Sequence, residues 1–227
     1  ILLIALSVLP QLGRTQAGEY FNRNINQEAH EVIGSVKCDV KWVFLTPNGF
    51  SVLHGKYGFF NRNIGNPRHQ IMKEIAYAGL ELKRTAFLPG GGFSILYGHN
   101  QHVSDGIPQE AIDVLNQLAQ SSHEVKHIAF TPSGGFVILY GKNGHYCRNI
   151  PQEAAEVLGR MAREGRELRS ITFTPQDGFS IIYNRNGFFN RNVPDEAHQQ
   201  MKRMANRGYQ LNYLVFHPNG GWALSSK

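Results

Sequence analysis

Apolar and polar positions alternate along this chain in two regular patterns, and residues 125–149 contain the first. VKHIAF (125–130) and FVILY (136–140) are short apolar runs rich in β-branched residues, as expected of buried strands. Pro132 and the glycines beside it predict a tight turn between the two runs. Asn143-Gly144 predicts a hairpin turn into a third, more polar strand at HYCRN (145–149).

The second pattern has the period of a helix and occupies residues 151–165. Pro151 suits the first turn, Glu153 favours the positive end of the helix dipole, and Gly165 suits a C-terminal cap. Apolar residues recur between them at i, i+3, i+4 and i+7: Ala154, Val157, Leu158 and Met161. The same stripe returns as Ala29, Val32, Ile33 and Val36, and as Ala111, Val114, Leu115 and Leu118. Each unit is therefore predicted to be three strands followed by a helix.

These units recur with a nearly constant period. One marker is the turn proline, at Pro47, Pro89, Pro132, Pro175 and Pro218, with separations of 42, 43, 43 and 43 residues. A second marker is Ile25, Ile64, Ile107, Ile150 and Val193, with separations of 39, 43, 43 and 43 residues. Two markers in one register indicate a true repeat. We therefore predict an α+β repeat protein of five units.

The two ends of the repeated region complement each other. GEYFNRNI, from Gly18, matches a third strand without its hairpin, and YLVFHPNGGWALSSK (213–227) matches a first and a second strand without a third. Pairing the two fragments would complete a fifth unit and leave no open edge. We predict that residues 18–227 form a single domain, a closed five-unit propeller-like ring whose last blade is shared by the N- and C-terminal strands. An all-β propeller and a linear α/β solenoid are the alternatives.

The N-terminal stretch has the character of a targeting segment. Residues 1–10 are apolar but too short to span a bilayer, which needs about 20 residues. They match the apolar region of a signal peptide, and Thr15-Gln16-Ala17 offers a cleavage point after Ala17. We predict that residues 1–17 are a signal peptide truncated at its start and that the protein is secreted or periplasmic. The alternative is a buried N-terminal strand or helix.

The order of the elements resembles a known architecture. Read from Phe136, a unit gives FVILYG, then HYCRN, then the helix from Pro151, then LRSITF. This order of two strands, a helix and a strand resembles the pentein-like five-bladed α/β-propellers. The repeat is also similar to the GGW-x-ILYG-x-NG…IPQE repeats of secreted proteins without an assigned activity. The resemblance implies a ring around a pseudo-fivefold axis and carries no catalytic residue across to this chain.

Composition and charge narrow the classes of partner. The hydrophobic fraction of 41% and the aromatic fraction of 11% are typical of a folded protein. The formal net charge of +6 favours acidic partners such as anionic glycans, cell-wall polymers or other acidic polymers. No run of Lys or Arg is dense enough to indicate a nucleic-acid arm.

Signatures of catalysis and of metal binding are weak. Cys38 and Cys147 occupy different repeat positions, so no disulfide is expected, and no CxxC or HExxH motif indicates a metal. We expect no cofactor. Cys147 with His145, two residues away on the same strand face, is a weak candidate nucleophile pair. An enzyme using His102, Asp105 or Cys147, with its site in the second unit or at the centre of the ring, is the alternative function.

The strongest candidate binding residues recur at fixed repeat positions. One position carries arginine, each followed by asparagine: Arg23, Arg62, Arg148 and Arg191. Another, at the end of the second strand, carries tyrosine: Tyr97, Tyr140 and Tyr183. Guanidinium groups beside aromatic rings are able to hold anionic or sugar-like ligands, which predicts a multivalent, non-enzymatic binding module. The competing interpretations are that these residues only join strand to helix, or that the protein is a structural scaffold. The second unit departs from the pattern, with Ser104-Asp105-Gly106 in place of Asn-Arg-Asn.

Overall fold

Sheets and helices alternate along the chain. The computed structural model describes residues 11–15, 18–36 and 39–227. In that part of the chain, four sheets hold three antiparallel strands each. They are β3 (Val40–Leu45), β4 (Phe50–His54) and β5 (Gly58–Arg62); β6 (Leu82–Phe87), β7 (Phe93–Tyr97) and β8 (Gln101–Asp105); β9 (Val125–Phe130), β10 (Phe136–Tyr140) and β11 (Gly144–Arg148); β12 (Leu168–Phe173), β13 (Phe179–Tyr183) and β14 (Gly187–Arg191).

A further sheet joins segments from opposite ends of the chain. Its strands are ordered β1-β2-β16-β15. They are β1 (Gln11–Thr15), β2 (Gly18–Arg23), β15 (Leu211–Phe216) and β16 (Trp222–Ser226). β2 pairs antiparallel with β16, with Tyr20 opposite Ser225 and Arg23 opposite Trp222. The strands β15, β16 and β2 thus correspond to the three strands of each other sheet, and β1 is an additional outer strand.

Each described helix follows the third strand of a sheet. The helices are α1 (Gln27–Ser35), α2 (Asn66–Tyr77), α3 (Gln109–Ala119), α4 (Gln152–Arg163) and α5 (Asp195–Asn206). All four residues of the stripe predicted on α4, from Ala154 to Met161, are buried. The predicted unit of three strands and a helix is therefore confirmed. The all-β alternative is wrong, because the segment it required as a fourth strand is helical in every unit.

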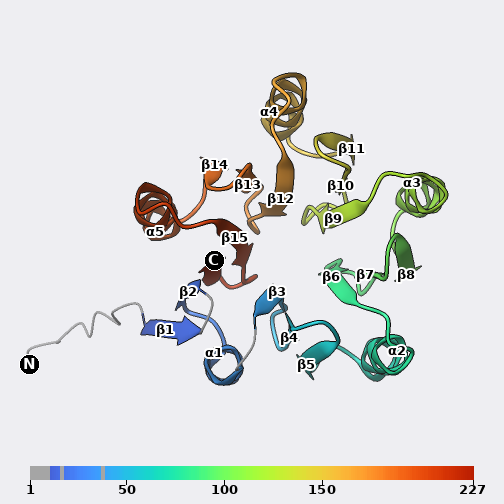
Figure 1. Ribbon diagram of the computed structural model, residues 1–227, viewed down its shortest axis with the longest axis horizontal. Helices are drawn as coiled ribbons and strands as arrows, with labels where there is room; N and C mark the ends of the chain where they lie inside the picture. Colours follow the sequence, from blue (N-terminus) through green and yellow to red (C-terminus); the bar gives the residue numbers. More distant parts are fainter. Residues whose placement is uncertain (1–10, 16–17, 37–38) are drawn as a thin grey trace, which may run out of the picture.

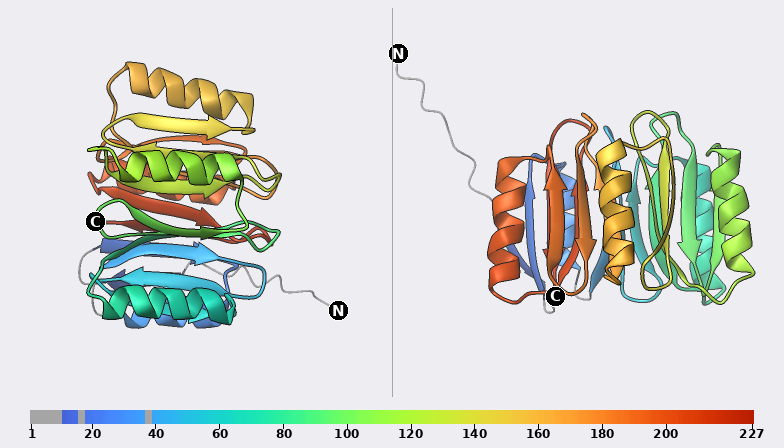
Figure 2. Two further views of the ribbon diagram at one scale, coloured as in Figure 1. Left: turned by 90° about the vertical axis from the view of Figure 1, so that its right-hand side faces the viewer. Right: turned by 90° about the horizontal axis from the view of Figure 1, so that it is seen from above.

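The units lie around a common centre (Figure 1). The first strand of each unit is innermost, and the helices are outermost (Figure 1). The inner strands contact one another in sequence, β3 with β6, β6 with β9, β9 with β12 and β12 with β15, and β15 contacts β3. Figure 2 shows the strands and helices running across the thickness of the molecule, with the helices on its outside. The side chains that fill the spaces between sheets form the hydrophobic core.

Polar contacts also link each inner strand to the next. The Nζ atom of Lys41 lies 2.9 Å from the Glu81 carboxylate, and that of Lys126 lies 2.7 Å from Glu167. Asn212 on β15 donates a hydrogen bond from Nδ2 to the carbonyl of Val40 on β3, at 3.3 Å. The same repeat position of the inner strand thus links neighbours at several places around the centre.

The asparagine that follows each repeated arginine has a backbone role. Asn24, Asn63, Asn149 and Asn192 all adopt a left-handed conformation, with φ between 50° and 53°. Asparagine tolerates this conformation better than most residues do. In the second unit Gly106 replaces it, with φ 63°. The asparagine of the repeated Arg-Asn pair is therefore explained by the turn into the helix.

The predicted signal peptide and Cys38 lie wholly or partly outside the described residues. Residues 1–10 and 16–17, most of the predicted signal peptide, lie outside the described residues, as does Cys38. Gln11–Thr15, also within the predicted signal peptide, forms β1 and pairs with β2. None of the helices in the described ranges is long and apolar enough to cross a membrane.

Candidate functional site

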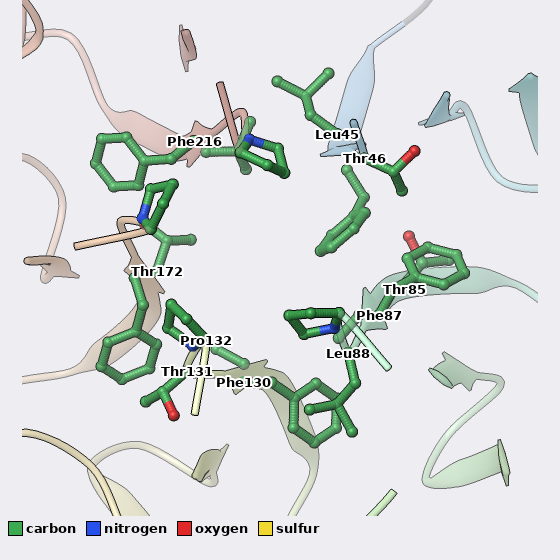
Figure 3. Close-up of a pocket in the computed structure, with 18 of the residues that line it drawn as sticks. Leu45, Thr46, Thr85, Phe87, Leu88, Phe130, Thr131, Pro132, Thr172 and Phe216 are labelled. Carbon is green, nitrogen blue, oxygen red and sulfur yellow. The ribbon is translucent and has the colours of Figure 1, made fainter. Parts of the chain in front are cut away.

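A pocket of about 410 Å³ lies where the five inner strands end and turn toward the second strands. Every unit contributes its turn proline to the lining: Pro47, Pro89, Pro132, Pro175 and Pro218. Figure 3 shows Phe87, Phe130, Pro132, Thr172 and Phe216 arranged around an open centre. Because it lies at the common centre, the five units build this one site together. We call it the central pocket.

The walls of the central pocket are mainly apolar and come from two successive positions of the inner strands. The last strand residue forms one set: Leu45, Phe87, Phe130, Phe173 and Phe216. The residue before it forms the other: Phe44, Ala86, Ala129, Thr172 and Val215. Phe44 is the exception to the small side chains of the second set, and its ring centroid lies 4.7 Å from that of Phe87. The other four side chains are short, and this leaves open space at the centre.

Two buried polar groups of the pocket lining have unused hydrogen-bonding atoms. His127 is fully buried and donates from Nε2 to the carbonyl of Ile171 at 2.7 Å, while its Nδ1 has no partner among the described residues. Thr85 is also fully buried, and its Oγ1 has none in the same part of the chain. With the proton on Nε2, Nδ1 is an acceptor. Because buried polar atoms are normally paired, these two atoms are exceptions in the packing behind the pocket wall.

His127 belongs to a cluster of unlike residues at the third position of the inner strands. We call Trp42, Arg84, His127 and Tyr213 the axial cluster; Ser170 holds the same position in β12. The Trp42 ring lies 5.1 Å from His127, 5.7 Å from Tyr213 and 5.0 Å from the Arg84 guanidinium carbon. This position carries a different residue in each of the five units, whereas most inner-strand positions carry similar ones.

Burial sets the charge of the axial cluster. Burial, assisted by the Arg84 charge, lowers the pKa of His127 to about 3, so the imidazole is neutral at pH 7. Burial, with repulsion from Arg169, lowers the pKa of Arg84 to about 10, which leaves it protonated. Burial raises the pKa of Tyr213 above its ordinary value. No carboxylate in the described ranges lies within ion-pair distance of Arg84.

The helix of the first unit, α2, places a cation in the wall of the central pocket. Four helices carry a fully buried alanine four residues after the Ile/Val marker: Ala29, Ala111, Ala154 and Ala197. In α2 this position is Arg68, which lines the pocket. Its guanidinium lies 5.2 Å from the ring centre of Phe93 and 5.5 Å from that of Phe87. It donates hydrogen bonds to the carbonyls of Ile64, at 2.6 Å, and of Gly91.

The four predicted arginines each pair with a helix glutamate. Arg62 lies 3.1 Å from Glu28, Arg148 3.4 Å from Glu110 and Arg191 2.9 Å from Glu153. Arg23 pairs with Glu196. The arginine side chains remain 39% to 62% exposed. The structure therefore places these arginines at strand-to-helix contacts, on glutamate carboxylates.

The contact between the second unit's outer strand β8 and the preceding helix α2 lacks both partners of this ion pair. Asp105 stands where the other units have arginine, and Pro67 stands where the other helices have glutamate. The two changes are matched, because each alone would leave one charge without its partner. They accompany the appearance of Arg68 next to Pro67. The departure seen in the sequence at Asp105 is therefore part of a local rebuilding that reaches the central pocket.

The predicted tyrosines lie at the other end of the blades. In β10, Tyr140 pairs with Gly144, while Phe136 at the far end of the strand pairs with Arg148. Tyr97 and Tyr183 hold the same place in their sheets. The structure does not bring these tyrosines and arginines together. The Tyr140 and Tyr183 rings instead cover the first residue of the next strand, where a Cβ on Gly144 or Gly187 would lie 2.4 or 2.3 Å from a ring atom.

The candidate catalytic residues lie on outer strands. Cys147 is half-buried on β11, and burial raises the pKa of its thiol, which disfavours the thiolate form a nucleophile needs. Burial also lowers the pKa values of His145 and His102. His102 contacts Ser104 at 3.0 Å and Asn116 at 3.2 Å. None of these residues, nor Asp105, lines the central pocket.

Sequence reasoning did not identify Arg68 or the inner-strand residues of the pocket. The signal was present in the repeat itself, because Arg68 falls where every other unit has alanine, and the axial position differs in all five units. Positions that differ between units would have indicated the site more directly than positions that recur. Across residues 18–36 and 39–227, no group of three His, Cys, Asp or Glu side chains is placed to hold a metal ion.

Comparison with known proteins gives no relative from which a role could be transferred. No protein-family model matches the chain, and no curated protein matches it either. The function of the chain is therefore inferred from the residues of its central pocket.

Proposed function

We propose that this chain is a non-enzymatic binding module that takes one small ligand in its central pocket. The observation that carries the proposal is the cavity of about 410 Å³, lined by apolar side chains from all five units. This volume falls within the ~300–1,000 Å³ typical of small-molecule sites, which are concave and mostly apolar with a few polar groups. The side chains of Thr46, Asn63 and Arg68, which line the pocket and are not fully buried, supply such polar groups.

We propose further that the units form a closed, propeller-like ring around this pocket, like the α/β-propellers that the sequence resembles. The pairing of β2 with β16 and the contact of β15 with β3 support closure. The hydrogen bond from Asn212 to Val40 supports it as well, since it repeats between the fifth unit and the first a link seen between other neighbours. In a linear solenoid the first and the last unit would lie apart, and these contacts would not form.

Secretion is part of the same proposal. It is supported by the apolar stretch at residues 1–10 and the small residue Ala17. Cleavage after Ala17 would remove β1 and leave β2, β16 and β15 as a three-stranded sheet like the other four. The mass of the protein recovered from outside the producing cells tests this, because cleavage predicts a chain that begins at Gly18.

The ligand proposal is tested with N-phenyl-1-naphthylamine, an uncharged aromatic probe that fluoresces in apolar sites. We expect one probe to bind per chain. Ala129→Phe places at a pocket position the residue that the first unit already carries there, Phe44, and should abolish binding by filling the cavity. The matched control is Ala119→Phe, at an exposed position at the end of α3, which should bind the probe normally. Equal binding by both variants would place the probe elsewhere and contradict the proposal.

Multivalent binding of a glycan or an acidic polymer is the second candidate function. It is favoured by the net charge of +6 and by the partial exposure of the four ion-paired arginines. An anion at these sites has to compete with a glutamate already present, which weakens each contact. Binding to glycans, cell-wall fragments and anionic polymers at low and high salt tests it. Salt-insensitive binding that is lost in Tyr140→Ala and in Arg148→Ala would favour this candidate over charge alone.

A further inference from the structure

The charge in the lining of the central pocket is of one sign, positive. Among the described residues that line it, Arg68 is the one charged side chain, since His127 is neutral at pH 7, and no aspartate or glutamate lines it. A cation in the wall of an apolar pocket attracts an opposite charge more strongly than it would in bulk water. The pocket therefore distinguishes ligands by charge as well as by shape.

Arg68 retains donors for a ligand. A guanidinium has five N–H groups. Nη1 and Nη2 each use one N–H on the carbonyls of Ile64 and Gly91, so one N–H remains on each of these terminal nitrogens, while Nε is buried. The two backbone hydrogen bonds and the rings of Phe87 and Phe93 hold the group in one position. A positioned guanidinium with unused donors is well suited to an acid group.

The helix α2 also lacks the acid that would compete for Arg68. The other helices carry glutamate immediately before the alanine that Arg68 replaces, and α2 carries Pro67 there. Asp105 pairs in register with Phe93, on whose ring Arg68 lies, but it forms no ion pair with Arg68. Arg68 therefore has no acidic partner among the described residues, which leaves its charge available to an anion.

We propose that the ligand of the central pocket is an apolar anion, with its acid group on Arg68 and its apolar part among the proline and phenylalanine side chains. This inference rests on the proposed function of the same pocket. The acid group is a carboxylate, sulfonate or similar oxyanion, and the apolar part is small enough for about 410 Å³.

Two probes that share their rings and differ in charge test this inference. 1-Anilinonaphthalene-8-sulfonate carries a sulfonate, and N-phenyl-1-naphthylamine has the same rings without it. We expect Arg68→Gln to weaken sulfonate binding by about tenfold, as for the loss of a hydrogen bond to a charged group, and to leave binding of the neutral probe within about twofold. Arg68→Lys keeps the charge and should recover part of the affinity. Arg191→Gln removes a charge that is paired with Glu153 elsewhere and should change neither probe.

The outcomes separate this inference from the proposed function. If the native protein binds neither probe, the pocket is not a ligand site and both ideas fail. If both probes bind with one copy per chain but Arg68→Gln does not change their ratio, the pocket function stands and the anion inference is wrong. If Arg191→Gln weakens the sulfonate as much as Arg68→Gln does, net charge alone accounts for the preference, and the role of Arg68 is wrong.

Discussion

The Arg191 guanidinium lies 2.9 Å from the Glu153 carboxylate and joins the outer strand β14 to the helix α4. Both side chains are partly exposed, so the pair is screened by solvent and expected to contribute about 0.2–1 kcal/mol. We predict that Arg191→Ala and Glu153→Ala each lower the free energy of unfolding by less than about 1 kcal/mol, with a coupling in the double variant of the same small size. Urea denaturation of the four proteins measures this. A coupling near zero would mean that the ion pair does not contribute to the stability of the protein.

Removal of the C-terminal strands should destabilise the whole domain. Deleting residues 213–227 removes β16 and most of β15 and leaves β2 without its partner. We predict loss of the single cooperative unfolding transition, followed by circular dichroism in urea. The matched control begins at Gly18, so it lacks residues 1–17, including β1, and it should unfold cooperatively. A shortened protein that keeps the denaturation midpoint of the full chain would indicate a linear stack of independent units.

Glycine at the first turn of each unit is required by close approach of the backbone. A Cβ on Gly135 would lie 1.9 Å from the carbonyl oxygen of Asn149, which cannot move away without disturbing β11. We predict that Gly135→Ala destabilises the protein by more than about 2 kcal/mol, as overpacking does. The control is Gly159→Ala within α4, where the nearest atom is the end of the Arg163 side chain, at 3.4 Å. Helix propensity predicts that this change stabilises by about 0.5–1 kcal/mol. Thermal denaturation compares the two.

The free energy of unfolding should decrease at acidic pH, because the buried His127 takes up a proton when the protein unfolds. Its pKa is about 3 in the folded protein and near 6.5 when exposed, so its contribution is complete above pH 6.5 and is lost as the pH falls from 6.5 toward 3. Between pH 8 and pH 5 this group should lower the free energy of unfolding by about 2 kcal/mol. His127→Gln removes the titrating group, so its stability should change less between these two pH values. Urea denaturation at both pH values gives the difference, and an equal loss in the two proteins would contradict the prediction.

The repeated elements were predictable because local signals agree in every unit. The turn proline, the Asn-Gly hairpin and the helix stripe each recur at one period, so an ambiguous segment in one unit is clarified by the others. The left-handed asparagines and the glycines beneath the tyrosine rings explain why these residues recur. Recurrence was thus a reliable guide to backbone geometry and to packing.

The candidate site was not predictable in the same way. Arg23, Arg62, Arg148 and Arg191 recur because four of the five units repeat the same ion pair with a helix. The central pocket forms where the ends of five inner strands meet. The sequence of one unit does not show which of its residues will lie there. Arg68 also contacts the rings of Phe87 and Phe93 and the carbonyl of Gly91, 23 residues later in the sequence. Only the folded chain brings this helix and this turn together.

The axial cluster has a consequence for how such a protein diverges from identical copies. When a unit is duplicated, a side chain on the outside can be kept in every copy, since the copies never meet. At the third position of the inner strands the copies converge, and five copies of a residue as large as Trp42 or as charged as Arg84 would collide or repel. Duplication therefore imposes selection for unlike residues at the centre before any ligand is involved. The repeated architecture therefore favours an asymmetric interior, and a site specific for one ligand is able to evolve there.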